Sequence, residues 1–284
     1  MPATILFGID VECASEDSRG FARHASKLFR DLECPVTWYV TGKTLETFPD
    51  EFRRVADGGP PPRGLIELQA HTYDHVLLKP VLMQVPAGRT VHGKTDWYYD
   101  PGGRIDEIER DLERCQAVFE RVLGKKAVAL TGPWGYYRGL GDRPDLLELV
   151  DRHGFRILRT FARDEHDANP VPIEWPPFFY EIQGYPRILE LMVHGYQDDF
   201  YWEAFEGPGR DPTYPDYQKR FADRVAAQGL TWSMASHDHG CATEEGFERK
   251  GAWFRGIIQH ARKLGIRFMT ATQYYDERRG HHEG

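Results

Sequence analysis

The sequence predicts an α/β fold in which helices cover a parallel sheet. Short runs of apolar and β-branched residues alternate with stretches whose apolar residues recur at helical spacing, almost throughout the chain. A chain of 284 residues with 40% hydrophobic and 28% charged residues is ordinary for a folded protein and fits one large α/β domain. No repeat, low-complexity tract or linker divides the sequence, so we expect a single domain over residues 1–284.

Turn residues or helices bound each predicted strand. The predicted strands are 5–9, 36–40, 65–70, 128–131, 156–159, 178–182, 188–193, 230–235 and 266–269. The predicted helices are 18–32, 47–56, 105–123, 144–152, 214–228 and 247–264. Residues 77–103 show no period and contain three aromatic residues in a row, so we expect a loop that is functional or disordered.

The composition excludes several classes of partner. The net charge is −8, and no lysine and arginine run is long enough to track phosphates, so neither nucleic acid nor an anionic membrane surface is an expected partner. No apolar run approaches the roughly 18 residues of a membrane span, and the first residues lack a signal-peptide pattern. The four cysteines include no C-x-x-C pair, which is typical of free thiols in a reducing compartment. We therefore expect a cytoplasmic protein.

Polar clusters directly follow four of the predicted strands. Because the carboxyl ends of parallel strands meet at one edge of a sheet, these clusters are expected to share that edge. They are Asp10 with Glu12, His71 with His75, Pro133 with Trp134, and His237 with His239.

One carboxylate and two imidazoles in these clusters can bind a metal ion. The H-x-x-x-H spacing of His71 and His75 brings both rings to one side of a helical turn, and a tight loop is the other interpretation. With Glu12 they suit Zn²⁺, and Co²⁺, Mn²⁺ or Ni²⁺ are alternatives. Three protein ligands leave a position for water, whose pKa the metal would lower. Asp10 can then act as base and a histidine of the last cluster as acid, as in a hydrolase of amides or esters.

Taken in order, these motifs resemble the polysaccharide deacetylase family of carbohydrate esterases. The resemblance runs from residue 5 to about 270 and implies an incomplete or distorted (β/α) barrel with about seven parallel strands. The segments that carry it are Ile9-Asp10-Val11-Glu12, His71-Thr72-Tyr73-Asp74-His75, Thr131-Gly132-Pro133-Trp134-Gly135-Tyr136 and Met234-Ala235-Ser236-His237-Asp238.

The resemblance also implies a role for each motif. The backbone around Pro133, Trp134 and Gly135 would help to hold the oxyanion, and His239 is an alternative acid or a substrate contact. The remaining implied roles are catalytic base for Asp10, metal ligand for Glu12, His71 and His75, and general acid for His237.

The sequence departs from the family pattern at two motifs. The usual adjacent pair of aspartates is replaced by Asp10 and Glu12 with one residue between them. Thr131 stands where an arginine is expected, two residues before the proline of the third motif. Arg138 or Arg159 could instead orient Asp10.

Other residues near the motifs are candidates for orienting or binding roles. The acidic residue that the family places near a tryptophan has its nearest candidates in Asp198 and Asp199, with Trp202. Asp74 either orients a ligand histidine or is a plain loop residue. Cys13 adjoins the site without a base of its own, so a nucleophilic role is not expected. Loop aromatics either stack on sugar rings or anchor loops to the core, and the candidates are Trp97, Trp134, Tyr136 and Trp202.

The predicted function is a metal-dependent hydrolase that removes an N- or O-acetyl group by attack of a metal-bound water. The expected substrate is an amino sugar or a related small intracellular molecule or oligosaccharide. A cyclic amide, imide or allantoin-type hydrolase is the alternative on the same fold. A catalytically silent carbohydrate-binding protein is the alternative outside the enzymes. Symmetric dimers are common, so a homo-oligomer stays open.

Overall fold

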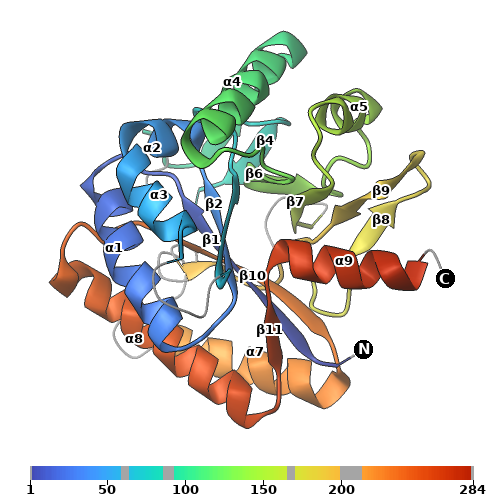
Figure 1. Ribbon diagram of the computed structural model, residues 1–284. Coiled ribbons are helices and arrows are strands. Elements are labelled where there is room, and N and C mark those ends of the chain that lie inside the picture. Colours follow the sequence, from blue (N-terminus) through green and yellow to red (C-terminus); the bar gives the residue numbers. More distant parts are fainter. Residues whose placement is uncertain (1, 59–63, 86–92, 165–169, 199–212, 283–284) are drawn as a thin grey trace.

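A mostly parallel sheet forms the centre of the chain, and helices lie around it (Figure 1). This computed structural model describes residues 2–58, 64–85, 93–164, 170–198 and 213–282. The strands of the large sheet are β1 (Thr4–Val11), β2 (Val36–Val40), β3 (Ile66–Ala70), β6 (Ala129–Tyr137), β7 (Ile157–Arg163), β8 (Phe178–Tyr180), β9 (Tyr185–Glu190), β10 (Thr231–His237) and β11 (Arg267–Met269). They run in the order β10-β1-β2-β3-β6-β7-β9-β8, and β11 pairs with β1.

The helices lie around the sheet. They are α1 (Glu16–Asp31), α2 (Gly42–Thr47), α3 (Pro49–Ala56), α4 (Ile105–Leu123), α5 (Pro144–Arg152), α7 (Tyr214–Gln228), α8 (Glu244–Lys263) and α9 (Ala271–His282), which follows the last strand, β11. Within the described ranges, no helix combines the length and the apolar character that a membrane span needs.

The predicted incomplete or distorted barrel with helices outside is confirmed. Of the described strands in the large sheet, β8 alone pairs in an antiparallel way, so eight strands are parallel where about seven were expected. The segment after β9 reaches β10 through single hydrogen bonds. His194 N–H donates to Ser233 O at 2.8 Å, and Ser233 Oγ donates to Met192 O at 2.8 Å. The single-domain expectation stays a prediction.

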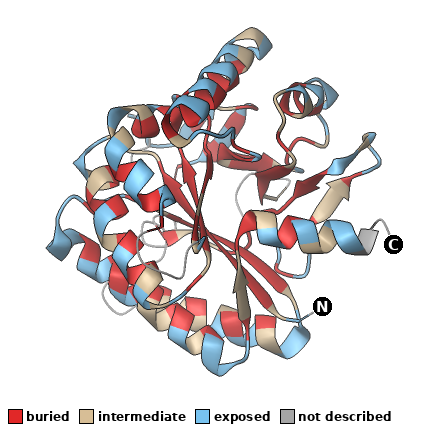
Figure 2. Cartoon of the chain, in the orientation of Figure 1, coloured by how far each residue is buried: buried red, intermediate tan, exposed pale blue. Residues whose placement is uncertain are grey.

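The two faces of β1 pack into two different clusters of buried residues. Successive side chains of a strand point to opposite faces. Ile5 and Phe7 pack into the main core, while Leu6 packs into a second cluster that includes Tyr274 of α9. Asp10, four residues after Leu6 and next to the last residue of the strand, therefore lies on the same face as Leu6. Figure 2 shows the buried residues concentrated in the strands and on the inner sides of the helices.

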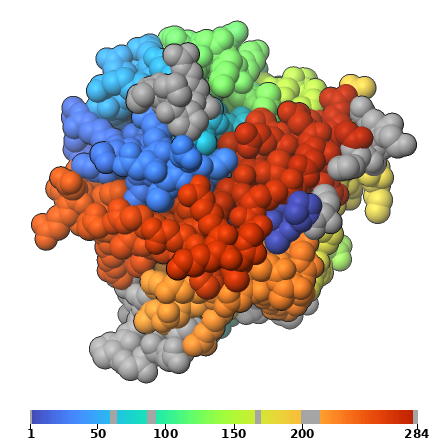
Figure 3. All heavy atoms as spheres, turned by 60° about the horizontal axis from the view of Figure 1, so that its bottom comes forward, coloured from blue at the N-terminus to red at the C-terminus, as the bar shows by residue number. Residues whose placement is uncertain are grey.

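Three parts of the chain differ from the sequence-based expectation. The helix predicted over 47–56 is α3, which begins at Pro49, and the sequence analysis missed the short helix α2 before it. The segment without a period contains a two-stranded antiparallel sheet of β4 (Val81–Gln84) and β5 (Trp97–Asp100). The pattern also missed α9, whose buried residues are too few to form a regular stripe. In Figure 3 the C-terminal part of the chain, coloured red, covers the face beside the blue N-terminal part.

The carboxyl group of Glu190 joins β9 to β7 inside the protein. Glu190 is fully buried. Its Oε1 accepts the backbone N–H groups of Thr160 and Phe161 at 2.6 and 3.0 Å. Its Oε2 accepts the hydroxyl groups of Thr160 and Tyr180, each at 2.7 Å. These bonds fix the backbone of β7 immediately after Arg159.

We expect Glu190→Ala to lower the free energy of unfolding by at least about 2 kcal/mol, because it leaves two buried N–H donors without an acceptor. Urea denaturation measures this, with Glu120→Ala on the exposed side of α4 as the control. Equal unfolding midpoints for the two variants would contradict this role of Glu190.

Candidate active site

A buried arginine orients Asp10 at the end of β1. Asp10 is 7% exposed and Arg159 is 2% exposed. The Nη2 group of Arg159 donates to Asp10 Oδ1. Its Nε group donates to Thr131 Oγ1 at 3.0 Å, and its guanidinium lies 4.3 Å from the centre of the Tyr39 ring. Asp10 is thus held in one orientation by a cation that the fold itself fixes.

The residues around Arg159 are small where space is needed. A Cβ atom at Gly8 would lie 2.9 Å from Arg159 Nη1, so glycine in β1 leaves room for the guanidinium. Thr131, at the position where an arginine was expected, supports Arg159 from the neighbouring strand. Of the two arginines considered from the sequence, the structure brings Arg159 to Asp10. Arg138 is exposed, stacks on Tyr137 at 4.9 Å and lines a cavity of about 450 Å³.

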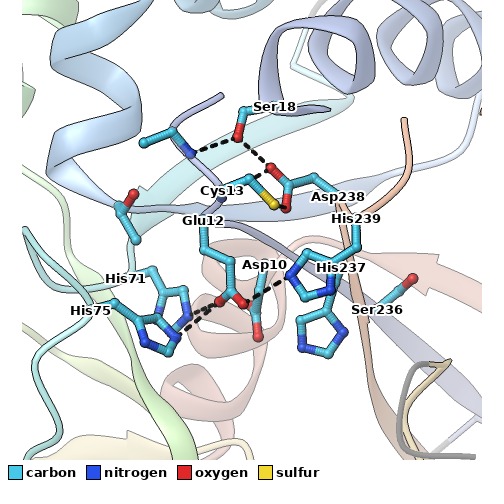
Figure 4. Close-up of polar contacts among 12 residues, drawn as sticks. Asp10, Glu12, Cys13, Ser18, His71, His75, Ser236, His237, Asp238 and His239 are labelled. Atoms are coloured by element: carbon cyan, nitrogen blue, oxygen red, sulfur yellow. Dashed lines mark hydrogen bonds and ion pairs between the residues drawn. The ribbon is translucent and has the colours of Figure 1, made fainter. Parts of the chain in front are cut away.

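Glu12 lies among three imidazoles (Figure 4). Its Oε2 is 2.7 Å from Nε2 of His71 and 3.1 Å from Nε2 of His75. Its Oε1 is 3.2 Å from Nε2 of His239. The structure therefore brings together the three predicted metal ligands, and it adds His239 on the other side of the same carboxylate.

Electrostatics favour the carboxylate form of Glu12. Burial alone would raise its pKa, but hydrogen bonds with His239, His71 and His75 outweigh burial and hold the pKa well below its ordinary value. For His71, burial acts to lower the pKa, and the charges of Asp10 and Glu12 outweigh it and raise the pKa. The imidazoles therefore hold Glu12 in its negatively charged form.

The turn between His71 and His75 is a tight loop held by a helix residue. Thr72 and His75 have φ angles of 54° and 57°, so the two imidazoles do not converge along a helical turn. The carboxyl group of Asp111, in α4, accepts the N–H groups of Tyr73 and Asp74 at 2.6 and 2.9 Å. Burial raises the pKa of Asp111.

Asp111, and not Asp74, is the acidic residue whose side chain supports the loop between His71 and His75. The side chain of Asp74 points to the surface and pairs with Lys43 at 2.7 Å, so it does not contact a ligand histidine. The sequence analysis did not identify Asp111. The sequence feature that could have identified Asp111 is its position as a charged residue in the apolar stripe of α4, between Ile108 and Cys115.

His237, the predicted acid, is held by Asp198. Nδ1 of His237 is 2.7 Å from Asp198 Oδ1, and the hydroxyl of Ser236 donates to Asp198 Oδ2 at 2.6 Å. Lys250 of α8 lies 3.1 Å from Asp198 Oδ2 and donates to the carbonyl of His237 at 2.7 Å. Asp199 and Trp202, the other candidates for this motif, lie outside the described residues.

Asp198 keeps its charge in a fully buried position. Burial acts to raise its pKa, but the charges of Lys250 and His237 outweigh burial and hold the pKa well below its ordinary value. The sequence analysis missed Lys250. The sequence feature that could have identified Lys250 is its position as a lysine in the buried stripe of α8, between Phe247 and Phe254.

The third motif lies within β6, at the register shift between Thr131 and Tyr136. The φ angles of Trp134 and Gly135 are 67° and 65°, and a Cβ atom at Gly135 would lie 2.2 Å from Ala162 Cβ, so this irregular part of β6 packs tightly on β7. The Trp134 ring stacks on Tyr98 of β5 at 5.0 Å. The oxyanion role of Pro133, Trp134 and Gly135 stays a prediction.

The other predicted aromatic contacts fall in different surroundings. Tyr136 is buried, and its hydroxyl accepts the N–H group of Leu78 at 2.7 Å, so it anchors a loop to the core. Trp97, on β5, is 53% exposed. Burial raises the pKa of Cys13 to about 11, which keeps the thiol protonated at neutral pH and disfavours a nucleophilic role.

The residues present fit a divalent metal ion. Donor atoms of Glu12, His71 and His75 all lie within 4.8 Å of one another. Nδ1 of His71 is 3.2 Å from the carbonyl of Thr131, which directs Nε2 toward Glu12, as the outer partner of a ligand histidine does. One carboxylate and two imidazoles form a donor set typical of catalytic zinc sites.

We expect Lys250→Met to lower the free energy of unfolding at pH 7 by about 3 kcal/mol, because it removes the cation beside a buried carboxylate. Asp198 has a lowered folded-state pKa, so its stabilising contribution is present above the unfolded pKa of about 3.9 and is lost as the pH falls through the folded value. In Lys250→Met the folded-state pKa of Asp198 is higher than in wild type. The difference in the free energy of unfolding between the variant and wild type therefore becomes smaller below about pH 4. Urea unfolding at pH 7 and pH 3 measures both effects.

The matched control is Lys263→Met, in the exposed last turn of the same helix, which we expect to change stability by less than about 0.5 kcal/mol. A difference between wild type and Lys250→Met that is the same at both pH values would contradict the electrostatic role of Lys250.

Comparison of the sequence with known proteins identifies one family. The profile of the family described as Polysaccharide deacetylase matches residues 14–156, half of the chain. This range includes His71 and His75 but neither Asp10 nor His237. A peptidoglycan deacetylase of Helicobacter pylori is 22% identical over 175 residues, which are 61% of this chain and 48% of that protein. The chain thus spans about half the length of that curated relative.

Solved structures share the fold at low sequence identity. A Mycobacterium smegmatis protein assigned to the polysaccharide deacetylases is 14% identical, with a TM-score of 0.64 over 99% of this chain and 91% of that one. PuuE allantoinase is 14% identical, with a TM-score of 0.65 over 96% and 89%. A CE4 family pseudoenzyme from Bacillus anthracis is 12% identical, with a TM-score of 0.53 over 98% and 67%. These structures support the α/β architecture alone. Because the family profile matches half of its length, the chain belongs to the polysaccharide deacetylase family.

Proposed function

We propose that the protein is a metal-dependent deacetylase that hydrolyses an N- or O-acetyl group of an amino sugar or a related small molecule. The observation that carries the proposal is the arrangement around Glu12. Two histidines face one of its oxygens, and the Arg159-held Asp10 and the Asp198-held His237 lie on neighbouring strands. Asp10 and His237 are register partners on β1 and β10, which brings a base and an acid to the same level of the sheet.

Glu12, His71 and His75 would hold the ion. A divalent ion bound there supplies Lewis acidity, which makes water a better nucleophile and polarises the acyl oxygen. Asp10 takes the proton of the attacking water, and Arg159 keeps the carboxylate of Asp10 oriented for that transfer.

His237 gives a proton to the departing amine or alcohol. Its Nδ1 is bonded to Asp198, so Nε2 is the ring nitrogen that can serve the leaving group. Lys250 keeps Asp198 ionised and holds the backbone of His237. Acid and base thus each have a buried partner of opposite charge.

The substrate class rests on the family and on the chemistry of the site. A carbohydrate substrate agrees with membership of the polysaccharide deacetylase family. The four free cysteines support a reducing compartment and therefore an intracellular molecule. Zn²⁺ is the ion that the donor set suits best, with Co²⁺, Mn²⁺ or Ni²⁺ as substitutes.

A cyclic amide or allantoin-type hydrolase is the second candidate. The structural likeness to PuuE allantoinase favours keeping it. A silent carbohydrate-binding protein is supported less well, because the predicted base, acid and three metal ligands are all present. Release of acetate from N-acetylated sugars and oligosaccharides, measured beside ring opening of allantoin and cyclic imides, separates the candidates.

We expect acetate release to disappear after chelation and to return with Zn²⁺ or Co²⁺. Asp10→Asn should lower kcat by about 10²–10⁴, because the base is lost, while the bound metal measured by elemental analysis stays unchanged. Asp74→Asn is the matched control, since its exposed carboxylate pairs with Lys43, and it should keep nearly full activity. Full activity of Asp10→Asn, or activity in chelator, would exclude the mechanism.

A further inference from the structure

A second set of metal-binding side chains lies on the other side of Glu12. Cys13 follows Glu12 in the chain, and Asp238 and His239 follow β10. One donor atom from each of Cys13, Asp238 and His239 lies within 4.8 Å of the others. Figure 4 shows the sulfur of Cys13 pointing toward Asp238, above the rings of His237 and His239.

Asp238 is a buried carboxyl group directed at this cluster. It is fully buried, and its Oδ1 lies 3.1 Å from Cys13 Sγ. Its Oδ2 accepts the hydroxyl group of Ser18 and the N–H group of Cys13, the latter at 3.4 Å. Its own N–H group donates to the carbonyl of Asp10 at 3.1 Å. Contacts with Asp10, Cys13 and Ser18 therefore hold the carboxyl group beside the thiol.

Glu12 connects this cluster with the first one. Its Oε2 faces His71 and His75, while its Oε1 faces Nε2 of His239 at 3.2 Å. The two oxygens of one carboxylate thus point to two different donor sets. A carboxylate in this position can bridge two metal ions, which in hydrolytic enzymes lie about 3.5–4 Å apart.

We propose that Cys13, Asp238 and His239 form a second site for a divalent first-row cation, with Glu12 as a shared ligand. A thiolate, an imidazole and carboxylates suit Zn²⁺ or Co²⁺ and not Mg²⁺ or Ca²⁺, which prefer oxygen ligands alone. The Cys13 thiol gives its proton to solvent when the ion binds, so binding releases one proton there. Glu12 then has one ion on each side.

Titration of the full chain with Co²⁺ tests the second site directly. Only the second site contains sulfur, so a near-ultraviolet thiolate-to-cobalt absorption band reports on it alone. We expect the wild-type chain to bind two equivalents and to show this band. Cys13→Ser should bind one equivalent without the band, and His75→Ala should lose the first equivalent and keep the band.

Cys241→Ser is the matched control. Cys241 is buried close to the same loop, with Sγ 3.5 Å from the carbonyl of His239, and its replacement should leave the band intact. A second measurement needs no variant: Zn²⁺ should slow alkylation of Cys13 at least tenfold, as followed by peptide mass spectrometry. One equivalent and no band in the wild-type chain, a band that persists in Cys13→Ser, or alkylation unaffected by Zn²⁺ would overturn the proposal.

These readouts are independent of the proposed deacetylase activity. A chain that shows the band but releases no acetate would retain the second site and lose the proposed function. A chain that binds one equivalent of metal, shows no band and releases acetate would support the proposed function and exclude the second site.

Discussion

The candidate site depends on the negative charge of Glu12 and on the fold that keeps it in place. Glu12 follows β1, His71 follows β3 and His239 follows β10, so three strand ends meet at one carboxylate. Burial alone would raise the pKa of Glu12, but its hydrogen bonds with the three imidazoles lower the pKa by more. The parallel arrangement of these strands is what makes this meeting occur, because their carboxyl ends share one edge of the sheet.

Two buried carboxylates near the site, Asp10 and Asp198, each have a cationic partner from another part of the sequence. Arg159 of β7 donates a hydrogen bond to Asp10 of β1, and Lys250 of α8 forms an ion pair with Asp198. Such pairs contribute little net stability, since desolvation offsets their attraction, but losing one partner leaves a costly buried charge. Their consequence is orientation: the carboxylate of Asp10 and the ring of His237 each have a fixed partner.

The sequence was informative where a signal is local. Alternating apolar runs predicted the parallel sheet, and polar residues at strand ends predicted the meeting of Glu12 with His71 and His75. Pairings between distant residues were harder to predict: Arg159 stayed one of two candidates, and Asp111 and Lys250 appeared as misfits in helical stripes. The hairpin of β4 and β5 and the helix α9 are too short or too irregular in pattern to give a periodic signal.

The location of a bound metal ion tests the central claim most directly. In crystals of the protein grown with Zn²⁺, anomalous scattering at the zinc absorption edge locates the ion. The account predicts a peak within about 2.0–2.2 Å of a Glu12 oxygen and of Nε2 of His71 and His75. A peak only at the surface group of Glu109, Glu113 and His153, or none at Glu12, would contradict it.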